Sequence, residues 1–364
     1  MTPVLLAERP TALVPAPIED TTRRRFITGA GAAALAAAFL AACGDDEELT
    51  PTPTSTPTAS TRRIKHKFGE TEVPLNPQRV ISVGWDEHDL ILSFGVVPIL
   101  QRDSWGEQPF ATWPWAQAAL GEAEPATFMD DMPLEQIAAL EPDLIMATWA
   151  GIDEDMYGLL SAIAPTVAQH PDYDDWAAPW DVRAAQVGAV FGKEEEARAQ
   201  VQAIGDRITA IRDAHPEWAG LQAVSVTNPD AGQLSVDMAT HSRGQLLKDF
   251  GFVLPEEIAA LTEDGTFSFL SAEQINLLDR DLIVWVNGQD DPSNIVEFPL
   301  RETLAAVGEG REVYCDKVLT AAFSIQSLMS YNYLLDQLVP EIEAAVDGDP
   351  STKVQKAVEY GLVS

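Results

Sequence analysis

Cysteine and basic residues are both scarce in this sequence. Its 364 residues include two cysteines, Cys43 and Cys315, too few for a disulfide framework or a cysteine-based zinc site. The chain has 23 Lys and Arg against 57 Asp and Glu, a formal charge of −34. Because nucleic-acid binding needs a concentrated basic surface, a nucleic acid is not expected as a partner. We expect Cys315, in a β-rich segment, to be a small buried thiol.

Long apolar runs and familiar enzyme motifs are missing too. The longest apolar run, residues 29–42, is too short for a transmembrane helix and is followed by no stop-transfer pattern. The sequence has no Gly-x-Ser-x-Gly elbow, P-loop or His-Glu-x-x-His. The "DEHD" segment at 86–89 could be drawn as a hydrolase dyad, but the sequence places no nucleophile beside it. We therefore expect neither catalysis nor a cofactor.

The N-terminus has the pattern of an export address. Arg23 and Arg24 resemble the arginine pair of a twin-arginine signal, and the apolar run ends in "LAAC", which resembles a bacterial lipoprotein box with Cys43 as the lipid-bearing first mature residue. An ordinary secretory signal with an accidental cysteine is the alternative. We predict a signal at 1–42 and a Thr/Pro-rich tether at 43–63, which cannot bury enough surface to fold. The protein should then be anchored to the outer face of the cell membrane, at the cell surface or in the periplasm.

The rest of the chain reads as two α/β lobes. Strand–helix–strand alternation begins with "RVISVGW" at 79–85 and predicts a largely parallel sheet. The pattern repeats, since "LEQIAALEPDLIM" (134–146) and "AEQINLLDRDLIV" (272–284) agree at seven of thirteen positions. Between them, apolar residues at helical spacing predict one long helix. The predicted boundaries are an N-terminal lobe at 64–192, a connecting helix at 193–218 and a C-terminal lobe at 219–364.

The order of these motifs resembles the substrate-binding lipoproteins of iron-siderophore ABC transporters. The segments that carry the resemblance are "LNPQRVISVGWDEHDLILSFGVVPI", "LEQIAALEPDLIMATW", "LLSAIAPTV" and "W...VRAAQVGAVFGKEEEARA", and it covers about residues 66–340. The resemblance implies two Rossmann-like lobes with a ligand cleft between them. It also implies a monomer that captures an iron(III)-siderophore complex and delivers it to an ABC permease in the membrane. In that family a surface glutamate on each lobe docks on permease arginines, and the matching residues are Glu135 and Glu273, although each could also be an ordinary acid in the first turn of a helix.

Loops at the expected carboxyl ends of the strands carry the candidate ligand contacts, because ligands bind there in open α/β sheets. These loops are rich in aromatic residues and hold two of the scarce arginines, which suits a large anionic chelate. The candidate ligand-binding residues are Trp85, Arg102, Trp105, Trp149, Tyr173, Trp176, Arg243, Asn287 and Phe323. Packing is the alternative for each tryptophan, and a salt bridge to a nearby acid is the alternative for Arg243.

Other cargoes and roles remain open at this stage. The same class of binding proteins includes cobalamin and haem binders, and His88 or His241 could serve as an axial haem ligand. A bare metal would need His88, His170 and His241 to converge with carboxylates. A surface or sensor lipoprotein without a transport role is a further alternative. The sequence does not rank catecholate, hydroxamate and carboxylate siderophores.

Overall fold

The structure, a computed structural model, describes residues 60–104, 108–230, 233–262 and 265–360. All of these belong to one compact unit, Pro57–Ser364. Four predicted features lie outside the described residues: the signal, the lipid-bearing role of Cys43, most of the tether and the ligand contact of Trp105. No helix within the described ranges is long and apolar enough to cross a membrane.

The first lobe is built on a five-stranded parallel sheet of order β5-β4-β3-β6-β7. Its strands are β3 (Val80–Ser82), β4 (Leu100–Arg102), β5 (Ala126–Phe128), β6 (Leu144–Ala147) and β7 (Thr166–Ala168), preceded by an antiparallel hairpin of β1 (Thr61–His66) and β2 (Gly69–Pro74). Its helices are α1 (His88–Ser93), η1 (Pro109–Ala111), α2 (Gln117–Leu120), α3 (Leu134–Ala139), α4 (Glu154–Ser161) and α5 (Trp180–Phe191). Strands β3 and β6 are buried throughout, as a sheet covered on both faces requires.

The second lobe has a mixed sheet of order β10-β9-β8-β11-β12. Its strands are β8 (Ala223–Asp230), β9 (Gln233–Asp237), β10 (Phe267–Ser271), β11 (Leu282–Val286) and β12 (Glu312–Cys315). Strands β8, β11 and β12 are parallel, whereas β9 is antiparallel to both β8 and β10. Because β9 begins only three positions after β8 ends, a parallel crossover between them is excluded. The second lobe therefore does not repeat the all-parallel sheet of the first lobe at the edge formed by β9 and β10. Cys315 is fully buried in β12, as expected.

Helices surround the second sheet and join the two lobes. They are α6 (Glu194–Ala214), η2 (Pro216–Trp218), α7 (Ser242–Asp249), α8 (Glu256–Ala259), η3 (Ala272–Leu278), α9 (Ser293–Val296), η4 (Arg301–Thr303), α10 (Ala305–Gly308), α11 (Lys317–Ile325), α12 (Leu328–Ala345) and α13 (Gln355–Glu359).

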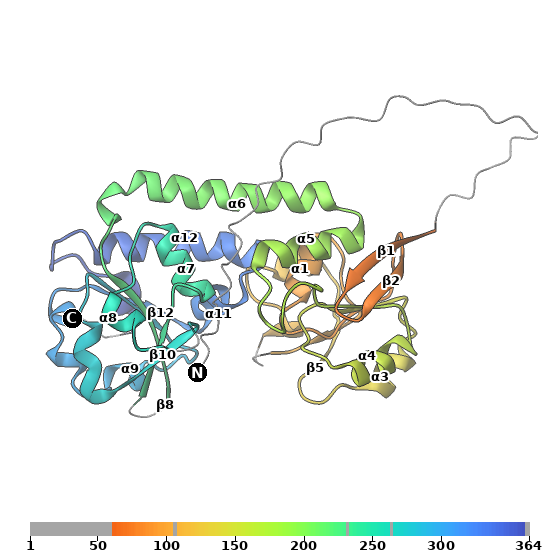
Figure 1. Cartoon of the computed structure of the whole chain (residues 1–364), viewed down its shortest axis with the longest axis horizontal. Helices are drawn as coiled ribbons and strands as arrows, with labels where there is room; N and C mark the ends of the chain where they lie inside the picture. The colour runs from red at the N-terminus through yellow and green to blue at the C-terminus, as the bar shows by residue number, and fades with distance from the viewer. Residues whose placement is uncertain (1–59, 105–107, 231–232, 263–264, 361–364) are drawn as a thin grey trace, which may run out of the picture. The chain divides into compact units, whose positions relative to one another are not determined.

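The long helix α6 runs across both lobes, with α12 lying along it (Figure 1). Three glutamates in its first turn and Arg212 in its last turn suit the helix dipole. Its apolar face buries Ala197 and Ile204 against a hydrophobic core that is continuous between the lobes. These features confirm the prediction of two α/β lobes joined by one long helix.

Candidate functional site

The first lobe places an arginine on an aromatic wall at the carboxyl ends of its strands. Arg102, the last residue of β4, lies with its guanidinium carbon 3.9 Å from the ring centre of Trp85 and 5.6 Å from that of Phe128. Its Nη2 donates to the carbonyl oxygen of Asp130 at 3.1 Å. Burial lowers the pKa of Arg102, while the charge of Asp130 opposes that effect. The side chain is only partly buried, so a face of this cation–π pair remains accessible.

A second arginine–tryptophan pair lies at the end of β6. The guanidinium carbon of Arg183, on α5, is 4.2 Å from the ring centre of Trp149. Trp176 meets Trp149 edge to face at 5.5 Å and is 48% exposed. Gly151 makes this arrangement possible, because a Cβ there would be 2.2 Å from an atom of the Trp176 ring. Sequence reasoning missed Arg183, since it considered loops after strands and not helix positions.

Arg183 also connects the two lobes. Its Nη2 donates to the carbonyl oxygen of Ile325 at 2.9 Å and, more weakly, to that of Gln326 at 3.4 Å. These carbonyls lie where α11 ends, and a cation is favourable at that negative end of a helix. Burial lowers the pKa of Arg183 to about 10, against the charges of Tyr331, Asp86 and Asp181. Arg183 therefore stays charged at neutral pH, at the junction between the lobes.

A buried glutamate holds the two tryptophan loops together. Glu87 accepts hydrogen bonds from Ser82 Oγ at 3.1 Å, at the end of β3, and from the Gly84 N–H at 3.0 Å, in the loop that follows. It also accepts from the N–H and hydroxyl of Thr148, in the loop after β6. Burial raises the pKa of Glu87, and these hydrogen bonds oppose the rise. The backbone completes the link, since the Trp85 N–H donates to the Trp149 carbonyl oxygen at 3.0 Å.

Two further ionisable side chains of the "DEHD" segment, His88 and Asp89 at the start of α1, are buried as well. Burial lowers the pKa of His88 to about 4, and its Nε2 lies 2.7 Å from the Ala111 carbonyl oxygen. Asp89 accepts from Trp115 Nε1 at 2.6 Å and, across the lobe junction, from Ser327 Oγ at 3.0 Å. His88 and Asp89 are thus both engaged by groups from other segments of the chain.

The predicted residues of the second lobe lie elsewhere. Arg243 forms a bidentate ion pair with the buried Asp237, its Nε and Nη2 each 2.7 Å from a carboxylate oxygen, and its Nη1 donates to Ser324 Oγ at 3.1 Å. The salt-bridge alternative for Arg243 is thus what the structure shows. Asn287 is buried and donates to the Asp291 carbonyl oxygen. The prediction that Phe323 lies in a loop is wrong. Helix α11 begins two residues after β12 ends, so Phe323 lies inside this helix, where its side chain is fully buried in the core.

The other candidates are placed as follows. Tyr173 packs edge-on against His170, with the ring centres 5.4 Å apart. Burial lowers the pKa of His241 to about 4, and its Nδ1 is 3.3 Å from Asp237. Among the described residues, no three His, Cys, Asp or Glu side chains form a group suited to a metal ion.

Glu135 and Glu273 are both exposed in the first turns of α3 and η3, at equivalent positions of the internal repeat.

Comparison with known proteins gives consistent matches over most of the chain. The profile of a family described as "Periplasmic binding protein" matches residues 80–319. The "Probable siderophore-binding lipoprotein YfiY" of Bacillus subtilis (strain 168) is 24% identical over 318 residues, 84% of this chain and 94% of that protein. The crystal structure of a periplasmic solute binding protein from Mycobacterium smegmatis str. MC2 155 is 33% identical with a TM-score of 0.71, covering 79% of this chain and 99% of that one. Staphylococcus aureus SirA complexed with staphyloferrin B is 24% identical with a TM-score of 0.62, covering 80% and 100%, and shows a shared fold.

Proposed function

Because the chain belongs to the periplasmic binding protein family, we propose that it captures a ferric siderophore between its lobes and delivers it to an ABC permease. The observation that carries this proposal is the pair of arginine–tryptophan stacks on the first lobe, Arg102 on Trp85 and Arg183 on Trp149. Aromatic faces suit the flat sides of a chelate, and guanidinium groups suit its anionic oxygens. The relative YfiY is named for siderophore binding, and SirA was solved with staphyloferrin B, which supports the same cargo class here.

Most of the predicted ligand contacts belong to the first lobe. We propose that the ligand is contacted by Trp85, Arg102, Trp149, Tyr173 and Trp176, and that Trp105, which lies outside the described residues, is a further contact. Arg243 and Asn287 would take part only after a rearrangement, since both are engaged in contacts within the second lobe. Phe323 would support the second lobe from its core.

A tryptophan-fluorescence titration tests the cargo. The panel holds ferric catecholate, hydroxamate and carboxylate siderophores, haem, cobalamin and divalent metals. We expect saturable binding of a ferric siderophore, and Arg102→Ala should weaken it about 10-fold, because one charged hydrogen bond or cation–π contact is worth about 1–2 kcal/mol. Arg198→Ala is the matched control, since that arginine is exposed on α6 and its ion pair is with Glu195 on the same helix. Binding of haem, cobalamin or a bare ion alone would overturn the siderophore assignment.

Permease docking is proposed for Glu135 and Glu273. The double variant Glu135→Ala plus Glu273→Ala should keep full ligand affinity and abolish uptake into cells, because exposed charges of this kind set encounter and register. The control is Glu154→Ala plus Glu256→Ala, which removes two other exposed acids from first helical turns. Normal uptake by the Glu135/Glu273 variant would contradict the docking role.

We also propose that Arg23 and Arg24 direct twin-arginine export and that Cys43 carries a lipid that anchors a monomer. Replacing the cysteine, as Cys43→Ala, should release the protein from the membrane fraction into the soluble fraction while the purified protein still binds its ligand. Retention of the Cys43→Ala protein in membranes, measured by fractionation and immunoblotting, would contradict the anchor.

A further inference from the structure

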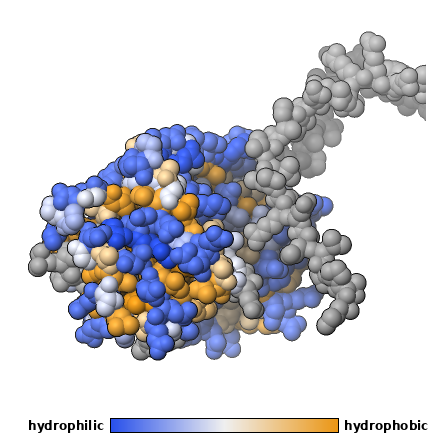
Figure 2. Space-filling model, turned by 60° about the vertical axis from the view of Figure 1, so that its left-hand side comes forward, coloured by the Kyte–Doolittle hydropathy of each residue, from blue (hydrophilic) through white to orange (hydrophobic). Residues whose placement is uncertain are grey.

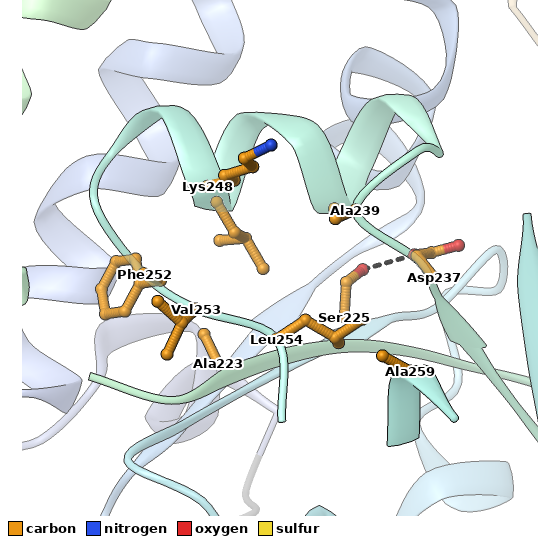
Figure 3. A pocket seen from close by; sticks show the side chains of 11 residues that line it. Ala223, Ser225, Asp237, Ala239, Lys248, Phe252, Val253, Leu254 and Ala259 are labelled. Carbon is orange, nitrogen blue, oxygen red and sulfur yellow. Dashed lines mark hydrogen bonds between the residues drawn. The ribbon is translucent and has the colours of Figure 1, made fainter. Parts of the chain in front are cut away.

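The second lobe contains a cavity of about 280 Å³ between α7 and the sheet (Figure 3). No candidate ligand-binding residue lines it, although Asp237 at one end is paired with the candidate Arg243. Its lining residues are Ala223, Ser225, Asp237, Ala239, Gly244, Leu247, Lys248, Phe252, Val253, Leu254 and Ala259. Lys248, Val253 and Ala259 are exposed, so the cavity opens on their side. Figure 2 brings the second lobe forward and shows apolar surface gathered in patches on this part of the molecule.

Small side chains create the space. Ala223 and Ser225 are two positions apart on β8 and therefore point to the same face, toward α7, whereas Val224 and Val226 fill the opposite face. Gly244 brings the start of α7 close to the preceding loop, since a Cβ there would be 2.2 Å from the Met238 carbonyl oxygen. The floor is thus made of small residues while the helix is held in place, and a cavity remains between them.

The cavity has one polar end and one apolar end. Figure 3 shows Ser225 and Asp237 joined by a hydrogen bond, with Phe252, Val253 and Ala223 grouped away from them. Ser225 Oγ donates to Asp237 Oδ2 at 2.6 Å, and the same carboxylate is paired with Arg243. The charge of Asp237 is therefore already balanced. A hydroxyl has one donor and two acceptor positions, so Ser225 Oγ can still accept a hydrogen bond.

We propose that this cavity is a second binding site, which takes a small neutral ring compound with one hydroxyl group. The ring would lie between Leu247 and Phe252, and the hydroxyl would donate to Ser225 Oγ. A charged ligand is disfavoured, because the walls are apolar and the one buried carboxylate has its cation. The volume of about 280 Å³ exceeds the roughly 150 Å³ of an engineered apolar cavity that binds benzene, so a single substituted ring has room. The inference does not depend on the siderophore proposal.

Phenol and toluene are the probes, because they have the same number of non-hydrogen atoms and differ in the hydroxyl. Titrations of the whole protein, followed by ligand-observed NMR, should show saturable phenol binding with a dissociation constant near or below about 1 mM. Toluene should bind about 10-fold more weakly. Ser225→Ala should bring phenol down to the affinity of toluene and leave toluene unchanged.

Two filling variants locate the site. Ala223→Leu fills the floor of the cavity and Ala259→Leu narrows its mouth, so each should lower phenol affinity at least about 10-fold. Ala260→Leu is the matched control for Ala259→Leu, because Ala260 is the next residue in the chain, is exposed and does not line the cavity. This control should bind phenol as tightly as the parent protein does. Ala259→Leu keeps the test decisive if Ala223→Leu does not fold. Absence of saturable binding, equal losses in Ala259→Leu and Ala260→Leu, or equal affinity for phenol and toluene would each overturn the proposal.

Discussion

Arg183→Ala is expected to weaken ferric-siderophore binding by about 10- to 100-fold, or about 1.4–2.8 kcal/mol. The substitution removes a charge from the proposed ligand surface and also removes the stack that orients Trp149. It further leaves the carbonyl oxygen of Ile325 without its donor, so the lobe junction loosens at the end of α11. Isothermal titration calorimetry with the siderophore selected by the fluorescence panel would measure the change.

Arg183→Lys separates the charge from the geometry. Lysine keeps the positive charge but has no planar guanidinium to stack on Trp149 while donating to Ile325. We expect an affinity between those of the parent protein and Arg183→Ala. The control Arg198→Ala should bind normally. Parent-like affinity in Arg183→Ala would show that the inter-lobe arginine does not contribute to the ligand site.

Asp89→Asn should stabilise the protein at pH 8 by roughly 2–4 kcal/mol and change little at pH 4. Burial raises the pKa of Asp89 from 3.8 to about 7, aided by the charge of Asp86 and opposed by the hydrogen bonds from Trp115 and Ser327. Between these two pKa values the folded protein holds a proton that the unfolded chain releases. Stability therefore falls as pH rises through this window and levels off above pH 7. Asparagine cannot ionise, and its oxygen can still accept both hydrogen bonds.

Urea unfolding of the parent protein and of Asp89→Asn at several pH values measures this effect. The difference between the two free energies of unfolding should grow from about pH 4 to pH 7, because the contributions of other groups, including Glu87, cancel. The control Asp155→Asn replaces an exposed acid of α4 and should give no such trend. A difference that is independent of pH would contradict the assignment of a buried, proton-holding Asp89.

Sequence patterns predicted the parts of the fold that depend on local periodicity. The apolar face of α6 and the shared segment in α3–β6 and η3–β11 are properties of consecutive residues. Strand ends also located Trp85, Arg102 and Trp149 at one edge of the first sheet, since parallel strands end together. These expectations needed no knowledge of distant contacts.

Features that depend on pairing across the chain could not be predicted in the same way. Arg183 lies in the first turn of α5, and only the folded structure brings it to Trp149 and Ile325. Arg243 was a candidate because of its place after a strand, yet Asp237, six residues earlier, holds its guanidinium. The loop expected for Phe323 overlooks a local signal, because Asp316 is an N-cap whose side chain accepts a hydrogen bond from the Leu319 N–H at the start of α11.

The hydrogen bond between Asp89 and Ser327 joins residues separated by 238 positions in the chain. Helix α12 also packs on α1, and both belong to one continuous core. The N-terminal lobe therefore cannot complete its interior until nearly the whole polypeptide is present. Contacts of such long range slow folding, because the intervening chain must be closed before they form. The two lobes should accordingly unfold in a single cooperative transition, and a fragment that ends before α12 should remain incompletely folded.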